Sequence, residues 1–224
     1  MSARADSFAA IVAERRSVRG FLPDPVPPEM IERVFGIAAD APSNCNIQPW
    51  ITHVASGATL ERLRAALLDD ARAGHTSPDV QASGGYGDPH RARKIGAAVA
   101  LFTATGVGRH DAAARQASFL RNFEMFGAPH AAVFFMPRSF GMREASDVGM
   151  YVQTLMLALT ANGLGSCAQG ALGHFAGTVK RVLDVPADML CLYGLSFGWP
   201  DPDHPSAAAR TDRAAIGDCV TFHR

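Results

Sequence analysis

A long apolar helix is the feature that most restricts how this chain can fold. From about Ala145 to Ala161 the sequence combines helical spacing with apolar residues on nearly every side. These residues are Val148, Met150, Tyr151, Val152, Leu155, Met156, Leu157 and Leu159. Such a helix is expected in a core or against another chain. Gly163 and Gly165 follow and are expected to end it. The fold must therefore cover most of this helix.

The rest of the chain alternates between the two kinds of periodic pattern. Amphipathic patterns predict helices at about residues 5–15, 28–40, 60–71, 111–125 and 175–183. Short apolar runs predict strands at 50–54, 97–102, 131–136 and 190–197. Residues 74–96 are rich in Gly, Ser, Pro and His and are expected to form a lid or excursion, because structureless loops this long are uncommon. We therefore predict a single domain over residues 1–224 with a layered α/β or α+β fold.

Composition limits the partners that this chain can have. Lys+Arg and Asp+Glu both total 21, so the chain has no general attraction for nucleic acid or anionic membrane, and an anion needs a local cluster. Charged residues make up 19%, below the usual quarter, so some apolar surface is expected to face another chain. No stretch is long enough to span a bilayer, and the first residues lack a signal-peptide core. The four cysteines form no CxxC pair, so we expect reduced thiols and a cytoplasmic protein.

Two familiar motifs occur in the wrong context. Residues 163–168 fit the dinucleotide fingerprint GxGxxG/A, which must follow a strand and open a helix; here it follows a helix and leads into a strand. Residues 194–198 fit the GxSxG elbow of serine hydrolases, which needs a helix directly after the serine. Pro200 and Pro202 oppose that helix, although Asp201, Asp203, His204 and His223 nominally complete a triad. The hydrolase stays as a minor alternative. No histidine pair has metal-ligand spacing, so we expect no metal site.

Two polar clusters near the start carry the stronger signal. Residues 15–19, Arg-Arg-Ser-Val-Arg, place three guanidiniums and a hydroxyl at a helix end. These groups can surround a phosphate, because the planar guanidinium donates two charge-assisted hydrogen bonds at once. Residues 42–50, Pro-Ser-Asn-Cys-Asn-Ile-Gln-Pro-Trp, gather amides and a hydroxyl before an aromatic residue. Such groups match the mixed donors and acceptors of a flavin ring or its ribityl chain.

Together these clusters resemble the N-terminal signature of the nitroreductase family, R-R/H-S-x-R/K followed by S-x-x-N-x-Q-P-W. Residues 163–170 resemble the family's G-L-G-[ST]-C stretch, and residues 198–202 with 210–213 resemble its closing segment. The chain departs from the family at residues 206–209, Ser-Ala-Ala-Ala, where many relatives have Asn-Arg. Residues 74–96 match no family signature.

The resemblance implies an α+β fold of α/β/α layers, with a mostly antiparallel sheet flanked by helices, in an intertwined homodimer. It also implies one FMN at each interface. One chain would hold the phosphate, ribityl chain and pyrimidine edge with Arg15, Arg16, Ser17 and Arg19. The partner would contribute Pro42, Ser43, Asn44, Asn46 and Gln48. Gln169 and Gly170 would lie along the ring near N5, and Arg213 and Arg210 would return to the phosphate.

The implied activity is hydride transfer. NAD(P)H would give hydride to flavin N5 and leave, and a nitroaromatic, a quinone or free flavin would enter the same space in a ping-pong cycle. No catalytic side chain is strictly required, because the cofactor carries the difficult step. Arg19 is our candidate for the positive group near N1 and O2. Tyr86, Phe123 and Phe126 are candidates for the pocket wall, with plain core packing as the alternative for each. A flavin storage or breakdown protein of the same fold remains the other hypothesis.

Overall fold

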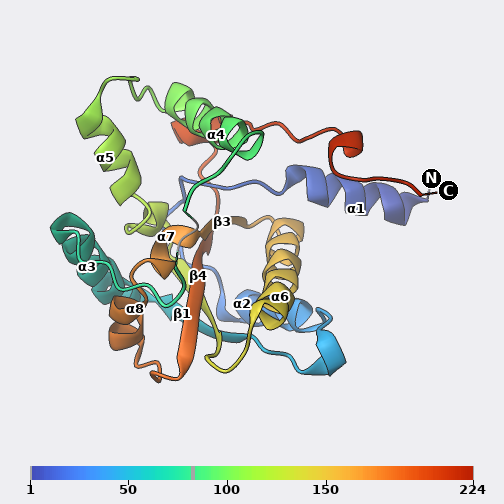
Figure 1. The fold of residues 1–224 in the computed structure, drawn as a ribbon, viewed down its shortest axis with the longest axis horizontal. Coiled ribbons are helices and arrows are strands. Elements are labelled where there is room, and N and C mark those ends of the chain that lie inside the picture. The colour runs from blue at the N-terminus through green and yellow to red at the C-terminus, as the bar shows by residue number, and fades with distance from the viewer. Residues whose placement is uncertain (1, 82–83, 224) are drawn as a thin grey trace.

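The computed structural model describes residues 2–81 and 84–223 (Figure 1). The helices are α1 (Ala3–Glu14), α2 (Pro28–Ala39), α3 (Gly57–Ala73), α4 (His90–Ala104), α5 (Ala112–Leu120), α6 (Met142–Ala161), α7 (Gly170–Gly173) and α8 (Ala176–Leu183). The strands are β1 (Ile51–Ser56), β2 (His130–Pro137), β3 (Gly165–Gln169) and β4 (Met189–Gly198). Short 3-10 turns are η1 (Asn44–Asn46), η2 (Met125–Gly127), η3 (Pro205–Ala208) and η4 (Ile216–Asp218).

The four strands form one sheet in the order β1-β2-β4-β3, and each neighbouring pair is antiparallel. The register pairs Ile51 with Phe135 and Gly165 with Gly198. A bulge interrupts the β2–β4 ladder between Phe134 and Phe135. The order places β3 at an edge of the sheet. The antiparallel sheet confirms the predicted α+β class.

Helices cover both faces of the sheet, so β2 is buried on both sides. Ala131, Val133 and Phe135 belong to the core beneath α3, α7 and α8. Ala132, Phe134 and Met136 belong to the core beneath α2 and α6. Successive side chains of a strand point to opposite faces, so a strand covered twice has an uninterrupted apolar sequence. Figure 1 shows α3 and α8 on one side of the strands and α2 and α6 on the other. The predicted three layers and the strand at 131–136 are confirmed.

The long apolar helix is α6, as predicted. The Glu144 carboxylate closes its first turn by accepting a hydrogen bond from the Gly141 N–H at 2.8 Å. The helix ends at Ala161; Asn162 caps it, and Gly163 then adopts a φ of 75° that suits glycine. Seven of its residues are buried, which are Asp147, Val148, Tyr151, Val152, Leu155, Ala158 and Leu159. The helix packs chiefly against α2.

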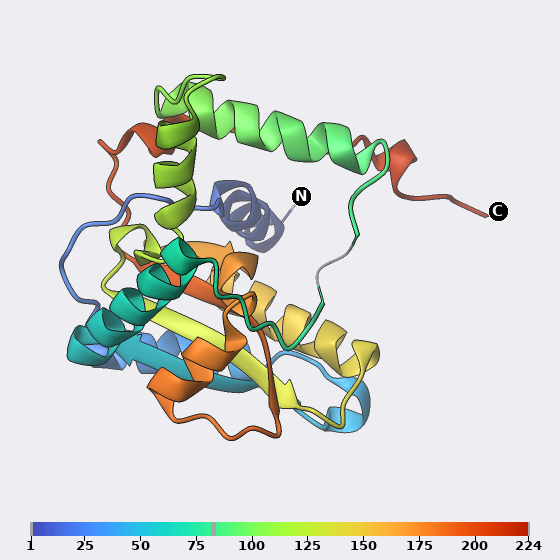
Figure 2. The same ribbon diagram turned by 60° about the vertical axis from the view of Figure 1, so that its left-hand side comes forward.

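Two predictions for the middle of the chain are wrong. The apolar run 97–102 lies within helix α4, not in a strand, and 90–96 of the predicted excursion belong to the same helix. A short apolar run cannot distinguish strand from helix by periodicity, and alanine favours the helix. The helix predicted over 111–125 ends at Leu120; a turn follows, and Met125 and Phe126 beyond it adopt left-handed backbone angles (φ 51° and 55°), which a helix continuing to 125 would not allow. We call α4 and α5 the arm; Figure 2 shows α4 standing away from the sheet with α5 between.

The arm and α1 differ from the other α-helices because none of their residues is buried. Figure 1 shows α1 extending away from the sheet. Among residues 2–81 and 84–223, no helix combines the length and the apolar composition that crossing a membrane requires.

Candidate functional site

The basic segment 15–19 lies along the outer edge of the sheet. Ser17 forms a parallel bridge with Ser166 on the edge strand β3. The Val18 N–H donates to the Ser166 carbonyl at 2.9 Å. The helix α1 ends at Glu14, so the arginines that follow it enter an extended segment fixed by this bridge.

The extended backbone divides the cluster between two sides. Burial raises the pKa of the Cys167 thiol on β3, and the nearby Arg19, Ser17 hydroxyl and Arg15 act in the opposite direction. Arg16 points the other way and donates to the Ala207 carbonyl at 2.6 Å. Arg15, Ser17 and Arg19 thus lie near the Cys167 thiol, whereas Arg16 is engaged with the segment after β4.

The edge of β3 offers backbone polar groups beside these side chains. Because the Ser166 carbonyl points outward to Val18, the N–H and C=O groups of Ala168 point outward as well. Ala168 and Gly170 are exposed, although the residues around them on β3 are buried. The Ser166 hydroxyl is buried and makes no hydrogen bond with the described residues. Small side chains and outward backbone groups thus form an open ledge on β3, where the Ala168 carbonyl accepts only a weak hydrogen bond, from Cys167 Sγ at 3.8 Å.

Gln169 is buried, and both ends of its side-chain amide are already bonded within the protein. Its side-chain amide donates to the Asn122 carbonyl at 2.6 Å and accepts a hydrogen bond from the Ser196 hydroxyl. Ser196 lies within strand β4, is fully buried and uses its hydroxyl in this bond. It does not occupy a strand-to-helix elbow, so the serine hydrolase hypothesis is wrong.

The second polar cluster, residues 42–48, is an exposed and strained loop. The Ser43 hydroxyl accepts from the Gln48 N–H at 2.9 Å, and Pro42, Asn44, Asn46 and Gln48 are exposed. Cys45, Asn46 and Gln48 have left-handed φ angles of 50°, 57° and 47°. Non-glycine residues adopt such angles at an energetic cost, and they concentrate at functional sites.

The two clusters lie at opposite ends of α6. The Asn44 N–H donates at 3.1 Å to the carboxylate of Asp147, in the first turns of α6. The basic segment instead bonds to Ser166, just beyond the last turn (Figure 1). A helix of 20 residues is about 30 Å long. The two clusters of one chain therefore cannot hold the same small cofactor.

The closing arginines take separate positions. Arg210 donates to the Ala207 carbonyl at 2.6 Å, which is the carbonyl that also accepts from Arg16. Arg213 bonds to the backbone of Thr211 and Asp212 and faces α4. The structure therefore groups Arg210 with Arg16 and leaves Arg213 in its own turn.

The three predicted wall aromatics do not share one hollow. Phe123 is fully buried in the core, edge-on to Phe119 and Phe175 with ring centroids 5.4 and 4.9 Å away. Tyr86 is exposed and lies 5.5 Å from the Lys94 ammonium. Phe126 lines the hollow beneath the arm, and the Arg19 guanidinium lies 6.0 Å from its ring.

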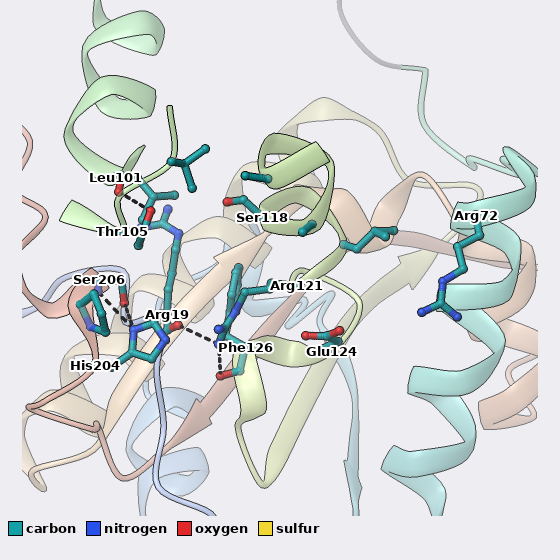
Figure 3. Close-up of a pocket in the computed structure, with 15 residues that line it drawn as sticks. Arg19, Arg72, Leu101, Thr105, Ser118, Arg121, Glu124, Phe126, His204 and Ser206 are labelled. Carbon is teal, nitrogen blue, oxygen red and sulfur yellow. Dashed lines mark hydrogen bonds between the residues drawn. The ribbon is translucent and has the colours of Figure 1, made fainter. Parts of the chain in front are cut away.

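This hollow beneath the arm has a volume of about 590 Å³ and lies between α4, α5 and residues 204–206 (Figure 3). Arg121 donates to the carbonyls of Arg19 and Phe126 at 3.4 and 3.3 Å. It thereby ties the strained turn of η2 to the basic segment. The sequence does not reveal Arg121, because this residue belongs to no motif and its partners Arg19 and Phe126 lie on other elements.

His204, at the rim of the hollow, is held as a neutral imidazole. Its Nδ1 accepts from the Ser206 N–H at 3.2 Å, so the proton of the neutral ring is on Nε2. Burial lowers the pKa of His204, and the charge of Arg121 lowers it further against the opposite effect of Asp201. The ring packs on Gly20, where any Cβ atom would lie 2.1 Å from it. In the sequence analysis His204 entered only as a nominal hydrolase residue.

Comparison with known proteins agrees with this geometry. A sequence model described as the nitroreductase family matches residues 12–199. The chain belongs to the nitroreductase family. The predicted resemblance is confirmed, and the match includes the basic segment, the 42–48 loop and β3.

Among its relatives, the nitroreductase NfnB of Mycolicibacterium smegmatis is 36% identical over 221 residues, which cover 98% of this chain and 94% of that protein. The crystal structure of FMN-dependent NfnB from Mycobacterium smegmatis in complex with NADPH gives a TM-score of 0.95, with 98% of this chain and 99% of that chain covered. A 4-nitrobenzoate reductase of Nocardioides sp. is 32% identical, and the match covers 97% of this chain and 90% of that protein. A 5,6-dimethylbenzimidazole synthase of Rhodospirillum rubrum is 31% identical, and the match covers 89% of this chain and 85% of that protein. Nitroreductase-family members thus differ in the reactions for which they are named.

Proposed function

We propose that this chain is an FMN-dependent oxidoreductase that passes hydride from NAD(P)H to a nitroaromatic, a quinone or a related small acceptor in a ping-pong cycle. The observation that carries the proposal is the bridge that fixes the basic segment 15–19 along the exposed edge of β3. The FMN-dependent, NADPH-bound relative of the same fold supports it. We also propose that residues 1–224 form a single domain. Its four free cysteines suit the reducing cytoplasm.

The residues at the edge of β3 fit FMN chemically. Arg15 and Arg19 supply guanidiniums for a phosphate and for the polar edge of a ring. The buried Ser166 hydroxyl has no partner among the described residues, and the Ala168 backbone offers both a donor and an acceptor. The small side chain of Ala168, together with Gly170, leaves room for a flat ring against the strand.

When bound, FMN would supply the atom that accepts hydride from the nicotinamide and returns it to the acceptor. Arg19 would stabilise negative charge at the pyrimidine edge. The Gln169 side chain, held by Asn122 and Ser196, would fix the end of β3 along the ring. For a nitro acceptor, one NAD(P)H and one proton convert the nitro group to a nitroso group and one water.

We further propose that the site is completed by a second copy of the chain. The two polar clusters of one chain are separated by the length of α6, so the 42–48 loop would serve the partner's flavin. The helix α1 supports this arrangement, because it has no buried residue and exposes Phe8 and Val12.

The visible absorption spectrum of the purified protein, with and without NADPH or NADH in the absence of oxygen, tests the redox function. We expect a flavin spectrum that bleaches on addition of reduced nicotinamide. A flavin spectrum that persists would favour the storage or breakdown hypothesis, which is the second candidate because a family relative is named as a synthase. Failure to bind added FMN would contradict both.

Coexpression of two variants tests the shared site. We expect Arg15→Ala and Asn46→Ala to be inactive alone, because each removes one half of both sites. In a mixture, half of the dimers are mixed and each has one intact site, so about one quarter of wild-type activity should return. A mixture without activity would contradict the shared site. If Arg19→Ala bound FMN with an unchanged reduction potential, the role of Arg19 would be wrong.

A further inference from the structure

His204 borders the hollow beneath the arm from the segment that follows β4. This hollow of about 590 Å³ is also bordered by Arg19 and Phe126 (Figure 3). Apolar side chains of α4 and α5 form much of its wall, namely Leu101, Ala114, Ala117 and Leu120. A hollow of this kind, mostly apolar with a few polar groups, is typical of a site for a small organic ligand. His204 is therefore placed to act on a ligand bound there.

Ser206 determines which ring nitrogen of His204 can act. The Nδ1 atom accepts from the Ser206 N–H at 3.2 Å and lies 2.8 Å from the Ser206 hydroxyl oxygen. Both hydrogen bonds that the ring makes with residues 2–81 and 84–223 use Nδ1. The neutral ring therefore carries its proton on Nε2, and Nε2 is the nitrogen that remains available to a ligand.

The Ser206 hydroxyl gives Nδ1 a route for proton exchange. A hydroxyl both donates and accepts, so it can donate to the unprotonated Nδ1 and accept from the protonated Nδ1. Ser206 is 9% exposed, which holds its side chain in one place. It belongs to the stretch 206–209, where the chain departs from the family pattern. The pair of His204 and Ser206 thus lies outside the family signature.

Packing fixes the ring beside the basic segment. The ring lies against Gly20, where a Cβ atom would be 2.1 Å from the Cγ atom of His204. The Gly20 carbonyl in turn accepts from the Asp201 N–H at 3.0 Å, which joins the segment before His204 to the same residue. Gly20 directly follows Arg19, our candidate for the pyrimidine edge of the flavin. His204 therefore lies next to the proposed flavin site.

The surroundings of the ring keep it neutral at rest. Burial lowers the pKa of His204, the charge of Arg121 after α5 lowers it further, and Asp201 after β4 acts in the opposite direction. The other charged residues that border the hollow are Arg19, Arg72 and Glu124. A negative charge that enters the site with a hydride would favour the protonated ring and raise this pKa. The ring would then gain a proton only after the hydride has arrived.

We infer that His204 is a catalytic acid, which takes up a proton at Nδ1 through the Ser206 hydroxyl and gives the Nε2 proton to the acceptor in the hollow. Reduction of a nitro group to a nitroso group and water consumes two electrons and two protons. The hydride brings both electrons and one proton, so one further proton is required as the N–O bond breaks and water leaves. The inference rests on the proposed function and names a further residue for it.

The ring returns to its resting state without another reactant. After the transfer it is neutral, with its proton on Nδ1 and the Ser206 hydroxyl as the acceptor. The Ser206 N–H has then lost its acceptor, which favours the tautomer with the proton on Nε2. Exchange with water restores that tautomer, and water also replaces the proton that the hydroxyl passed to Nδ1.

The test compares two acceptors of the FMN-loaded protein, because nitrobenzene needs the extra proton and ferricyanide takes up electrons alone. We expect His204→Gln to lower the ratio of kcat/KM for nitrobenzene to kcat/KM for ferricyanide about hundredfold, the contribution of a positioned acid. Ser206→Ala keeps the N–H but loses the hydroxyl, and should lower the ratio by less. His110→Gln is the matched control, because His110 is exposed between α4 and α5 and does not border the hollow.

The pH dependence and a spectroscopic measurement follow the same proton. For nitrobenzene, kcat/KM should fall as the pH rises through the pKa of His204, and this limb should be absent for ferricyanide and in the Gln variant. Nuclear magnetic resonance of nitrogen-labelled histidine reports the ring directly. We expect the Nε2–H tautomer in the FMN-loaded protein, and a higher pKa of His204 after treatment with dithionite.

Two results would overturn the inference. The first is an equal effect of His204→Gln on both acceptors, which would make the residue structural. The second is a pKa of His204 that does not rise after dithionite treatment. Reduction of ferricyanide by NADPH or NADH tests the proposed function separately, because it requires the flavin and the hydride but no proton from His204. If His204→Gln does not fold, the ratio measured for Ser206→Ala decides the result.

Discussion

Helices α6 and α4 have similar apolar content, but only α6 is buried in the core. Seven of the twenty residues of α6 are buried, whereas none of the fifteen residues of α4 is. The helix α6 is covered by the sheet and by α2, while α4 exposes Ile95 and Val99 by 52% and 57%. The chain therefore builds one body from its own core and adds an arm whose apolar surface it does not cover.

The two regions are joined by a polar junction. Asp79, between α3 and the arm, accepts from Arg138 at 2.7 Å, from Lys180 at 2.8 Å and from the Cys191 N–H at 2.9 Å. Ser77 is fixed beside it through backbone hydrogen bonds with His174 and Gly177. The predicted lid over residues 74–96 thus begins with a segment anchored to the body.

The largest effect should follow from opening the core of the body. Leu155 on α6 is fully buried, and Leu155→Ala should lower the free energy of unfolding by about 2–5 kcal/mol through lost burial and a residual cavity. Chemical denaturation measures this loss. The same change at Leu22, which is 38% exposed, is the control and should cost much less. Equal losses would contradict the assignment of the core.

The body is also the part that the sequence predicts best. Burial on both faces forces uninterrupted apolar residues into β2, and burial of α6 removes polar residues from most of its surface, so both leave strong patterns. The arm was mispredicted because its alanine-rich run 97–102 has no burial to impose a period. Where tertiary cover is absent, composition alone does not distinguish helix from strand.

The candidate site also has a part that the sequence predicts and a part that it does not. Local motifs revealed the residues 15–19 and 42–48, because each is a compact run of polar groups. The sequence did not reveal that Arg16 turns away from Arg15, since that depends on pairing with Ser166 on β3. Arg121 was missed for a related reason, because its neighbours Arg19 and Phe126 come together only in the folded chain.

A smaller effect is expected at the junction between the two regions. Asp79→Asn removes the charge that Arg138 and Lys180 share, and should lower the free energy of unfolding by about 1–3 kcal/mol. Limited proteolysis between residues 74 and 89 should become faster. Asp69→Asn, at an exposed position on α3, is the control. If proteolysis were unchanged, Asp79 would not anchor the arm.

The dependence of the free energy of unfolding on acidic pH gives a second measure of the Asp79 junction. Burial raises the pKa of Asp79, but hydrogen bonds from Cys191, Lys180 and Arg138 outweigh it, so the folded pKa lies below the ordinary value of an aspartate. The contribution of Asp79 is therefore complete above its unfolded pKa and is lost as the pH falls through the lower, folded value. The Asn variant should lack this part of the acid-induced loss.

The smallest effect is expected on the arm, and the same type of substitution in the body serves as its comparison. Val152→Ser on α6, where the side chain is 2% exposed, places a hydroxyl in the core and should cost about 1–3 kcal/mol. Val99→Ser on α4, where the side chain is 57% exposed, should change the free energy of unfolding by less than about 0.5 kcal/mol. Denaturation at several protein concentrations measures both. A loss at Val99 that matches the loss at Val152 and grows with protein concentration would mean that a second chain covers the arm. The contrast between the two helices would then belong to the isolated chain, because the assembled dimer would bury both.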